Sequence, residues 1–172
     1  MIKGKSIQLR ALEPEDIDFL VAIENNQELW QYSATQTPYA RFVLKEYIDN
    51  AFRDIYEVKQ LRLVIESSEM EAAGLIDLYD FDPKNKRVGV GIVITEKYQN
   101  KGFAFEAIQL LSNYCFTHLD MHQIYADIDE KNSKSIFLFE KAGFVKSGVK
   151  KDWNYHNGAF SNVLFYQLVL PK

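Results

Sequence analysis

The sequence predicts a mixed α/β (α+β) fold built on a mostly antiparallel sheet that contains one parallel strand pair. Short runs rich in β-branched residues alternate with segments in which apolar residues recur every three or four positions, and these are the patterns of strands and helices respectively. Three of the strand-like runs follow one another across short polar turns, which is typical of an antiparallel meander. A later strand, helix, strand succession is most simply a right-handed crossover, whose two strands are parallel neighbours.

The first third of the chain predicts one strand and two helices. Residues 7–11 alternate apolar and polar side chains as a half-buried strand does, and the acidic stretch 13–16, with Pro14 in it, is typical of a helix start. Thr37-Pro38 opens a second helix, whose predicted apolar face is Leu44, Tyr47, Ile48, Ala51 and Ile55. Between the two helices lies the aromatic segment 29–32, and segments in such a position often form a lid over a site.

The meander is predicted over residues 61–65, 73–81 and 88–94. Gly89 and Gly91 fall inside its third strand. Glycine weakens a strand interior unless the chain bulges there or a ligand approaches the backbone closely. We therefore expect the third strand to lie beside the functional site.

The segment 89–116 is predicted to form a strand, a turn and a helix around which the rest of the fold is arranged. Its strand passes through a polar turn that ends at Gly102, and a helix is predicted to follow over 101–118 because apolar residues recur at three- and four-residue steps. A strand that runs through such a turn into a helix aims unpaired backbone N–H groups, and the positive end of the helix dipole, at one point. Such a point attracts phosphate.

The last third predicts a strand, a helix and a hairpin. Residues 124–128 form the strand parallel to the third meander strand, and the helix that follows has a polar cap at Asn132 and a glycine stop at Gly143. Asn157-Gly158 is a strong turn signal between two apolar arms, which predicts a terminal β-hairpin.

Composition narrows the class of protein. A chain of 172 residues with 47% hydrophobic composition is long enough for one domain, predicted over 1–172, with a substantial core. Its net charge of −4 gives no indication of a nucleic-acid-binding surface and favours cationic ligands. The one cysteine, Cys115, lies on the apolar face of the predicted helix and is expected to be a buried hydrophobe. With no apolar run long enough to span a membrane, a cytoplasmic location is expected.

Two segments carry a family resemblance. Residues 99–104, QNKGFA, resemble the Q/R-x-x-G-x-G/A pyrophosphate loop of the GNAT N-acetyltransferases, and residues 132–144, NSKSIFLFEKAGF, resemble that family's N-x-x-[SA]-x-x-x-Y-x-K-x-G-F segment. The order of the predicted elements is also that of the GNAT fold over the whole chain. The resemblance implies a sheet whose parallel pair splays to hold acyl-CoA, with helices on both faces.

The resemblance also implies an acetyltransferase that uses acetyl-CoA as cosubstrate. The cofactor contacts are implied to come from one strand, one turn and one helix: main-chain groups of Ile92, Val93 and Ile94 for the pantetheine arm, residues Gln99, Asn100, Lys101, Gly102, Phe103 and Ala104 for the pyrophosphate, and Asn132, Ser135, Phe139 and Lys141 beside the cofactor. For the turn, the same role follows independently from the helix-terminus argument.

The catalytic assignment departs from the family pattern at Phe139. Many members have a tyrosine there that protonates the leaving thiolate, and phenylalanine has no proton to give. Water or another tyrosine such as Tyr166 would then supply the proton, with Phe139 as an apolar wall. Asp77 is the candidate base or amine-binding carboxylate, and the alternative for it is a charged residue on a solvated sheet face. The three histidines show no metal-ligand spacing, so no metal site is expected.

Several acceptors stay open at this point. The chain resembles the bacterial spermidine/diamine branch in the segments 10–16, 25–26, 98–102 and 157–158, and it is also similar to the branch acting on ribosomal-protein N-termini. These resemblances imply transfer to a primary amine on a polyamine such as spermidine, on a peptide N-terminus or on an amino sugar. Residues 33–39 and Gly89 replace acidic positions of the polyamine branch. A module that binds acyl-CoA without turnover is the alternative from another functional class. An exposed sheet edge near the terminal hairpin would allow a homo-oligomer.

Overall fold

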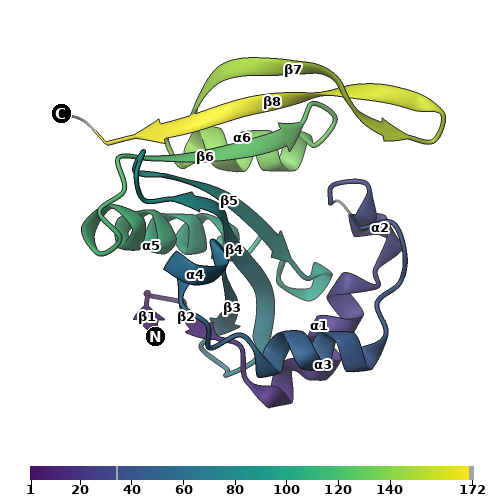
Figure 1. Ribbon diagram of the computed structural model, residues 1–172, viewed down its shortest axis with the longest axis vertical. Coiled ribbons are helices and arrows are strands. Elements are labelled where there is room, and N and C mark those ends of the chain that lie inside the picture. Colours follow the sequence, from purple (N-terminus) through teal and green to yellow (C-terminus); the bar gives the residue numbers. More distant parts are fainter. Residues whose placement is uncertain (34, 171–172) are drawn as a thin grey trace.

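The computed structural model describes residues 1–33 and 35–170, and within these residues the strands form one eight-stranded sheet (Figure 1). In sheet order the strands are β1 (Ile2–Lys3), β2 (Ile7–Ala11), β3 (Leu61–Ser67), β4 (Ala72–Asp82), β5 (Arg87–Ile94), β6 (Gln123–Asp129), β8 (Ala159–Val169) and β7 (Val145–His156). The helices are α1 (Ile17–Glu24), α2 (Gln27–Trp30), α3 (Arg41–Asp49), α4 (Ile55–Val58), α5 (Phe103–Thr117) and α6 (Ser133–Lys141), with 3₁₀ turns at Pro14–Asp16 and Glu96–Tyr98. Every pair of neighbouring strands is antiparallel except β5 and β6, which confirms the predicted fold class.

The second predicted helix is shorter than expected. α3 ends at Asp49, and the separate turn of helix α4 starts after Asp54, whose side chain accepts a hydrogen bond from an N–H group of α4 at 2.6 Å. Asn50 and Asp54 bond to nearby backbone groups, and residues of this kind favour helix ends over helix interiors. Ala51 and Ile55 were therefore wrongly placed on one continuous helical face.

Helices cover both faces of the sheet, as the resemblance implied. α5 and α6 pack on one face, where Leu111 and Phe139 belong to the larger cluster of buried apolar side chains. α1 and α3 pack on the other face, where Leu20 and Leu44 join a second cluster with Leu75 of β4. The expectation that Cys115 is a buried hydrophobe is confirmed, since it is 0% exposed within the larger cluster.

The parallel strand pair separates along its length. β4 and β5 pair from Gly74 and Ile94 as far as Asp82 and Arg87, whereas β5 and β6 pair only over residues 87–89 and 123–125. Beyond Gly89, β5 stays with β4 and β6 stays with β8, so the sheet splays between β5 and β6. Figure 1 shows the β7–β8 hairpin extending past the end of β6 and over the region of α2. The splay and the hairpin together position the site.

Candidate active site

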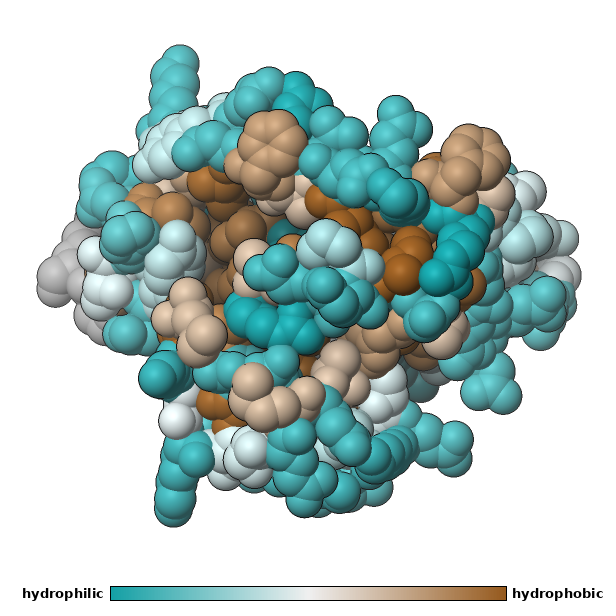
Figure 2. Space-filling model, turned by 90° about the horizontal axis from the view of Figure 1, so that it is seen from below, coloured by the Kyte–Doolittle hydropathy of each residue, from teal (hydrophilic) through white to brown (hydrophobic). Residues whose placement is uncertain are grey.

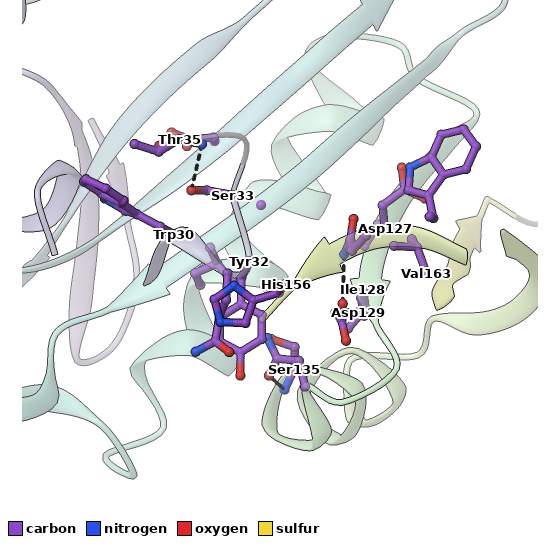
Figure 3. Close-up of a pocket in the computed structure, with 18 of the residues that line it drawn as sticks. Trp30, Tyr32, Ser33, Thr35, Asp127, Ile128, Asp129, Ser135, His156 and Val163 are labelled. Atoms are coloured by element: carbon purple, nitrogen blue, oxygen red, sulfur yellow. Dashed lines mark hydrogen bonds between the residues drawn. The ribbon is translucent and has the colours of Figure 1, made fainter. Parts of the chain in front are cut away.

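A cleft of about 1120 Å³ opens where β5 and β6 separate. Four parts of the chain line it: α2 and the segment after it, the adjoining strands β4 and β5, the end of β6 with the start of α6, and the β7–β8 hairpin. Figure 3 shows Trp30, Ser33 and Thr35 on one side of this cleft and Asp127, Asp129 and Val163 on the other. Trp30, Gln31 and Tyr32 of the aromatic segment 29–32 line this cleft, and a role as a lid stays a prediction.

The predicted pyrophosphate turn adopts an unusual backbone conformation. Gly102 has a φ of 83° and is the N-cap residue of α5, with no side-chain oxygen bonded to the first-turn N–H groups. Asn100 is also left-handed, with a φ of 62°. The Lys134 ammonium group of α6 approaches the side-chain oxygen of Gln99 at 3.4 Å. The N-terminus of a fifteen-residue helix is thus left open to an anion, with a lysine beside it.

The residues predicted beside the cofactor divide between the cleft and its surroundings. Four of them line the cleft, namely Ile92, Asn132, Ser135 and Phe139, whereas Val93, Ile94, the 99–104 turn and Lys141 are not among its lining residues. Asn132 is the N-cap residue of α6 and accepts a hydrogen bond from the Ser135 backbone N–H group at 3.1 Å. Phe139 is 3% exposed and packs edge-on against Phe144, with 5.0 Å between the ring centroids. Lys141 lies 4.9 Å from the centre of the Phe105 ring.

Asp77 lines the cleft but is already paired. Both of its oxygens accept hydrogen bonds at 2.8 Å from Arg62, whose guanidinium group also pairs with Glu24. Burial lowers the pKa of Arg62, but the hydrogen bond and charge of Asp77 and the charge of Glu24 outweigh it and raise that pKa above its ordinary value. Arg62 also lies over the Tyr47 ring, 5.5 Å from its centre. One guanidinium group therefore serves two carboxylates at this edge of the cleft.

Sequence reasoning missed two further carboxylates of the cleft, Asp127 and Asp129 at the end of β6. Asp127 pairs with Lys150 of β7 at 2.8 Å. Asp129 accepts hydrogen bonds from Ser161 at 2.6 Å, from Asn154 at 2.8 Å and from a backbone N–H group. Burial raises the pKa of Asp129, but these hydrogen bonds outweigh it and hold the pKa below its ordinary value. The side-chain partners lie more than twenty positions away in the chain, so no local pattern indicates them.

Tyr166, named from the sequence as an alternative proton donor, does not line the cleft. It is 2% exposed, and its hydroxyl group donates a hydrogen bond to Glu140 at 2.8 Å. The cleft instead contains three other tyrosines, Tyr32, Tyr79 and Tyr155, and one histidine, His156. Among the described residues no group of histidine, cysteine and acidic side chains is arranged to hold a metal ion, and no helix is long and apolar enough to cross a bilayer.

Comparison with known proteins gives one consistent answer. Residues 6–145 match the model of the acetyltransferase (GNAT) domain. The chain is 32% identical to spermidine N(1)-acetyltransferase of Escherichia coli K12 over 164 residues, which cover 95% of this chain and 86% of that protein. It is 31% identical to spermidine N(1)-acetyltransferase of Vibrio cholerae over 160 residues, which cover 93% and 91% of the two chains.

A solved structure agrees in shape. The crystal structure of spermidine N-acetyltransferase from Vibrio cholerae in complex with CoA and spermine has a TM-score of 0.86 and 28% identity, over 96% of each chain. The chain belongs to the GNAT acetyltransferases and is an N-acetyltransferase that moves an acetyl group from acetyl-CoA to a primary amine.

Proposed function

We propose that the acceptor of this enzyme is a polyamine such as spermidine. The observation that supports this best is the charge of the cleft, whose lining, among the residues that the structure describes, contains Asp77, Asp127 and Asp129 but no lysine or arginine. Lys150 neutralises Asp127, whereas Asp77 and Glu24 share one guanidinium group, and Asp129 is held by the neutral donors Ser161 and Asn154 and a backbone N–H group. Negative charge therefore remains in the cleft, and it attracts an acceptor with several ammonium groups. The curated relatives quoted above act on spermidine.

The cofactor is proposed to enter from the α5 and α6 side. In this proposal the 99–104 turn binds the pyrophosphate, the main chain of 92–94 holds the pantetheine arm, and Asn132, Ser135 and Lys141 flank it. The open N-terminus of α5 and the Lys134 ammonium group near Gln99 favour an anion at the turn. Phe139 serves as an apolar wall of the cleft on that same side.

In the proposed mechanism, few charged side chains of the protein take part in the acetyl transfer itself. The amine must lose a proton before its nitrogen attacks the thioester carbon, so the rate should rise with pH through the titration of the amine. Holding the two reactants in contact supplies a large part of the rate enhancement. We propose Asp77 as an amine-binding carboxylate, because the two hydrogen bonds from Arg62 fix its orientation and leave a further lone pair on each oxygen to accept a hydrogen bond from an ammonium group.

An acceptor panel tests the proposal. The purified protein is incubated with acetyl-CoA and, in turn, spermidine, spermine, putrescine, a monoamine, glucosamine and a peptide with a free N-terminus, and acetylated products are measured by mass spectrometry. We expect kcat/KM for spermidine to exceed that for the monoamine about tenfold or more, with the advantage shrinking in high salt. Preferred acetylation of the peptide or of glucosamine would contradict the polyamine assignment. CoA binding without any acetylated product would instead indicate a non-catalytic acyl-CoA-binding module.

We also propose that the chain forms a homo-oligomer in the cytoplasm. A related structure of spermidine N-acetyltransferase from Vibrio cholerae is described as dodecameric. Figure 2 shows the face that carries α1 and α3, where apolar side chains are exposed among polar ones. In and just after α3, Phe42 is 72% exposed and Phe52 is 84% exposed, which favours an interface there. Light scattering at several concentrations measures the mass, and a monomer at all of them would contradict this part of the proposal.

A further inference from the structure

β5 presents bare backbone to one face of the sheet next to the cleft. Gly89 and Gly91 pair across the strands with Tyr79 and Asp77 of β4. Because directly paired positions share a face and alternate positions repeat it, these four residues all lie on the α1 and α3 face of the sheet. Asp77, Tyr79 and Gly91 all line the cleft.

The two glycines differ in what lies above them. A Cβ atom at Gly89 would come within 2.2 Å of the Tyr79 ring, so that ring already fills the space. A Cβ atom at Gly91 would meet only one atom within 4 Å, a Tyr79 ring carbon at 3.9 Å. The backbone of Gly91 is therefore open, and Tyr79 forms one boundary of the opening. Gly89 was expected to signal a bulge or a close ligand, but its physical role is to admit the Tyr79 ring.

The Tyr79 ring also closes the point at which the sheet splays. The last backbone pair between β5 and β6 joins Gly89 to Tyr125, and the Tyr125 ring packs edge-on against Tyr79 with 5.8 Å between centroids. Burial is the main cause of the raised pKa of the Tyr79 hydroxyl group, and the charge of Asp127 of β6 adds to it. The ring thus bridges the two strands where they begin to part, and it is fixed on several sides.

The two faces of the sheet separate the reactants. Phe139 and the open N-terminus of α5 lie on the α5 and α6 side, where the cofactor is proposed to enter. Gly91, Asp77 and Tyr79 lie on the opposite side of the same cleft. An acceptor that attacks a thioester reaching through the splay would approach from the side of these three residues.

We propose that the open backbone at Gly91, bounded by Asp77 and the Tyr79 ring, is the seat of the reacting amine, and that Tyr79 is a specificity-determining residue of the enzyme. The inference rests on the proposed function and adds the place where the acceptor binds. An aromatic face attracts an alkylammonium group, and Asp77 adds charge beside it. In the reaction the N–C bond forms and the C–S bond breaks. The amine proton leaves to water, and the thiolate of CoA takes a proton from water.

Glycine substitutions test the seat. Gly91→Ala adds one methyl group that the fold accommodates, because its nearest neighbour is at 3.9 Å and its φ is not positive. Gly148→Ala is the matched control, since this other strand glycine, in β7, meets only a Phe165 atom at 3.7 Å and is not among the lining residues of the cleft. We expect Gly91→Ala to lower kcat/KM for spermidine about tenfold or more, as one methylene group in a filled site does, with CoA affinity unchanged by calorimetry. Gly148→Ala should change neither quantity.

Two substitutions of Tyr79 separate the ring from its hydroxyl group. Tyr79→Phe keeps the aromatic face and should keep the ranking of acceptors. Tyr79→Leu removes the face and should raise KM for spermidine more than it lowers kcat, while the monoamine changes less. If Tyr79→Leu unfolds the chain, the Gly91→Ala and Gly148→Ala pair still decides the question.

The outcomes separate this inference from the proposed function. The inference is overturned if Gly91→Ala retains wild-type kcat/KM for spermidine, or if its CoA affinity falls as much as its acceptor efficiency, because the seat would then belong to the cofactor. The proposed function fails instead if the wild-type protein acetylates no polyamine. In that case the same Gly91→Ala and Gly148→Ala comparison with whichever acceptor the panel identifies still supports or overturns the seat.

Discussion

The two ends of the active site are built in different ways. The proposed pyrophosphate turn is a continuous segment, 99–104, and its anion-binding character comes from a left-handed glycine and a helix N-terminus. The acceptor side of the cleft is assembled from α2, β4, β5, β6 and the β7–β8 hairpin, with hydrogen bonds that join residues far apart in sequence. A turn made of backbone tolerates change in its neighbours, whereas an assembled wall depends on each of its long-range contacts.

The difference shows where each kind of specificity resides. Backbone N–H groups recognise a phosphate that every acetyl-CoA molecule carries, so the turn needs a particular conformation more than particular side chains. Acceptors differ in charge and shape, and only side chains brought together by the fold distinguish them. Substitutions at the two ends should therefore separate cofactor binding from acceptor choice.

The largest effect is expected at Gly102. Gly102 and Gly158 share a left-handed backbone, with φ of 83° and 80°, and a Cβ atom at either would have no neighbour within 4 Å. Valine at each position should strain the local backbone to a similar extent. Only Gly102→Val should weaken CoA binding, by about tenfold or more, because only this turn opens onto the α5 N-terminus. Calorimetry measures the CoA affinity of each variant. Equal affinity in the two folded variants would show that the turn does not bind the cofactor.

A smaller effect is expected at Asp129, which joins the acceptor wall to the hairpin. Asp129→Ala leaves Ser161 and Asn154 without their acceptor and should lower the free energy of unfolding by about 1–3 kcal/mol. Amide exchange over residues 152–160 should accelerate, while CoA affinity should hold. Chemical denaturation and hydrogen exchange measure the two quantities. Protection of the hairpin equal to that of wild type would show that Asp129 does not hold it.

The same carboxylate gives the stability a pH dependence. Its pKa is lower in the folded protein than the ordinary 3.8. The unfolded chain therefore binds the proton more readily, so the stabilisation is complete above that ordinary value and is lost as the pH falls through the folded-state pKa. Below about pH 4, the free energy of unfolding should decrease more steeply with falling pH for the wild type than for Asp129→Asn. Denaturation at several pH values measures this difference. Identical slopes for the two proteins below that pH would contradict this role of Asp129.

The smallest effect is expected from Phe139→Tyr. If water protonates the thiolate, as we propose, the added hydroxyl group should change kcat little. Phe139 is 3% exposed and packed edge-on against Phe144, so its place is that of an apolar wall. Steady-state kinetics at saturating spermidine decide the matter. A rise in kcat of about tenfold or more, on the scale of general acid catalysis, would show that proton delivery limits the wild-type enzyme.

The strands of the meander and their parallel neighbour were predictable because each carries a continuous apolar pattern. The same holds for α5 and α6, which have Gly102 and Asn132 as N-cap residues and have an apolar side. The length of α3 was not predictable, because the Asn50 and Asp54 bonds that end one helix and start the next compete with an apolar pattern that continues through them.

The family, the fold and the turn that opens onto the α5 N-terminus could be predicted from the residues alone, because these depend on local periodicity and on backbone conformations that glycine signals over a few residues. The acceptor side depends on how the strands and helices pack. This packing paired Asp77 with Arg62, and it brought Asp129 to Asn154 and Ser161 of the hairpin. It also filled the space at Gly89 with Tyr79 while leaving Gly91 open. These arrangements arise when strands and helices pack, and two glycines two residues apart in sequence look alike until their neighbours on the next strand are known.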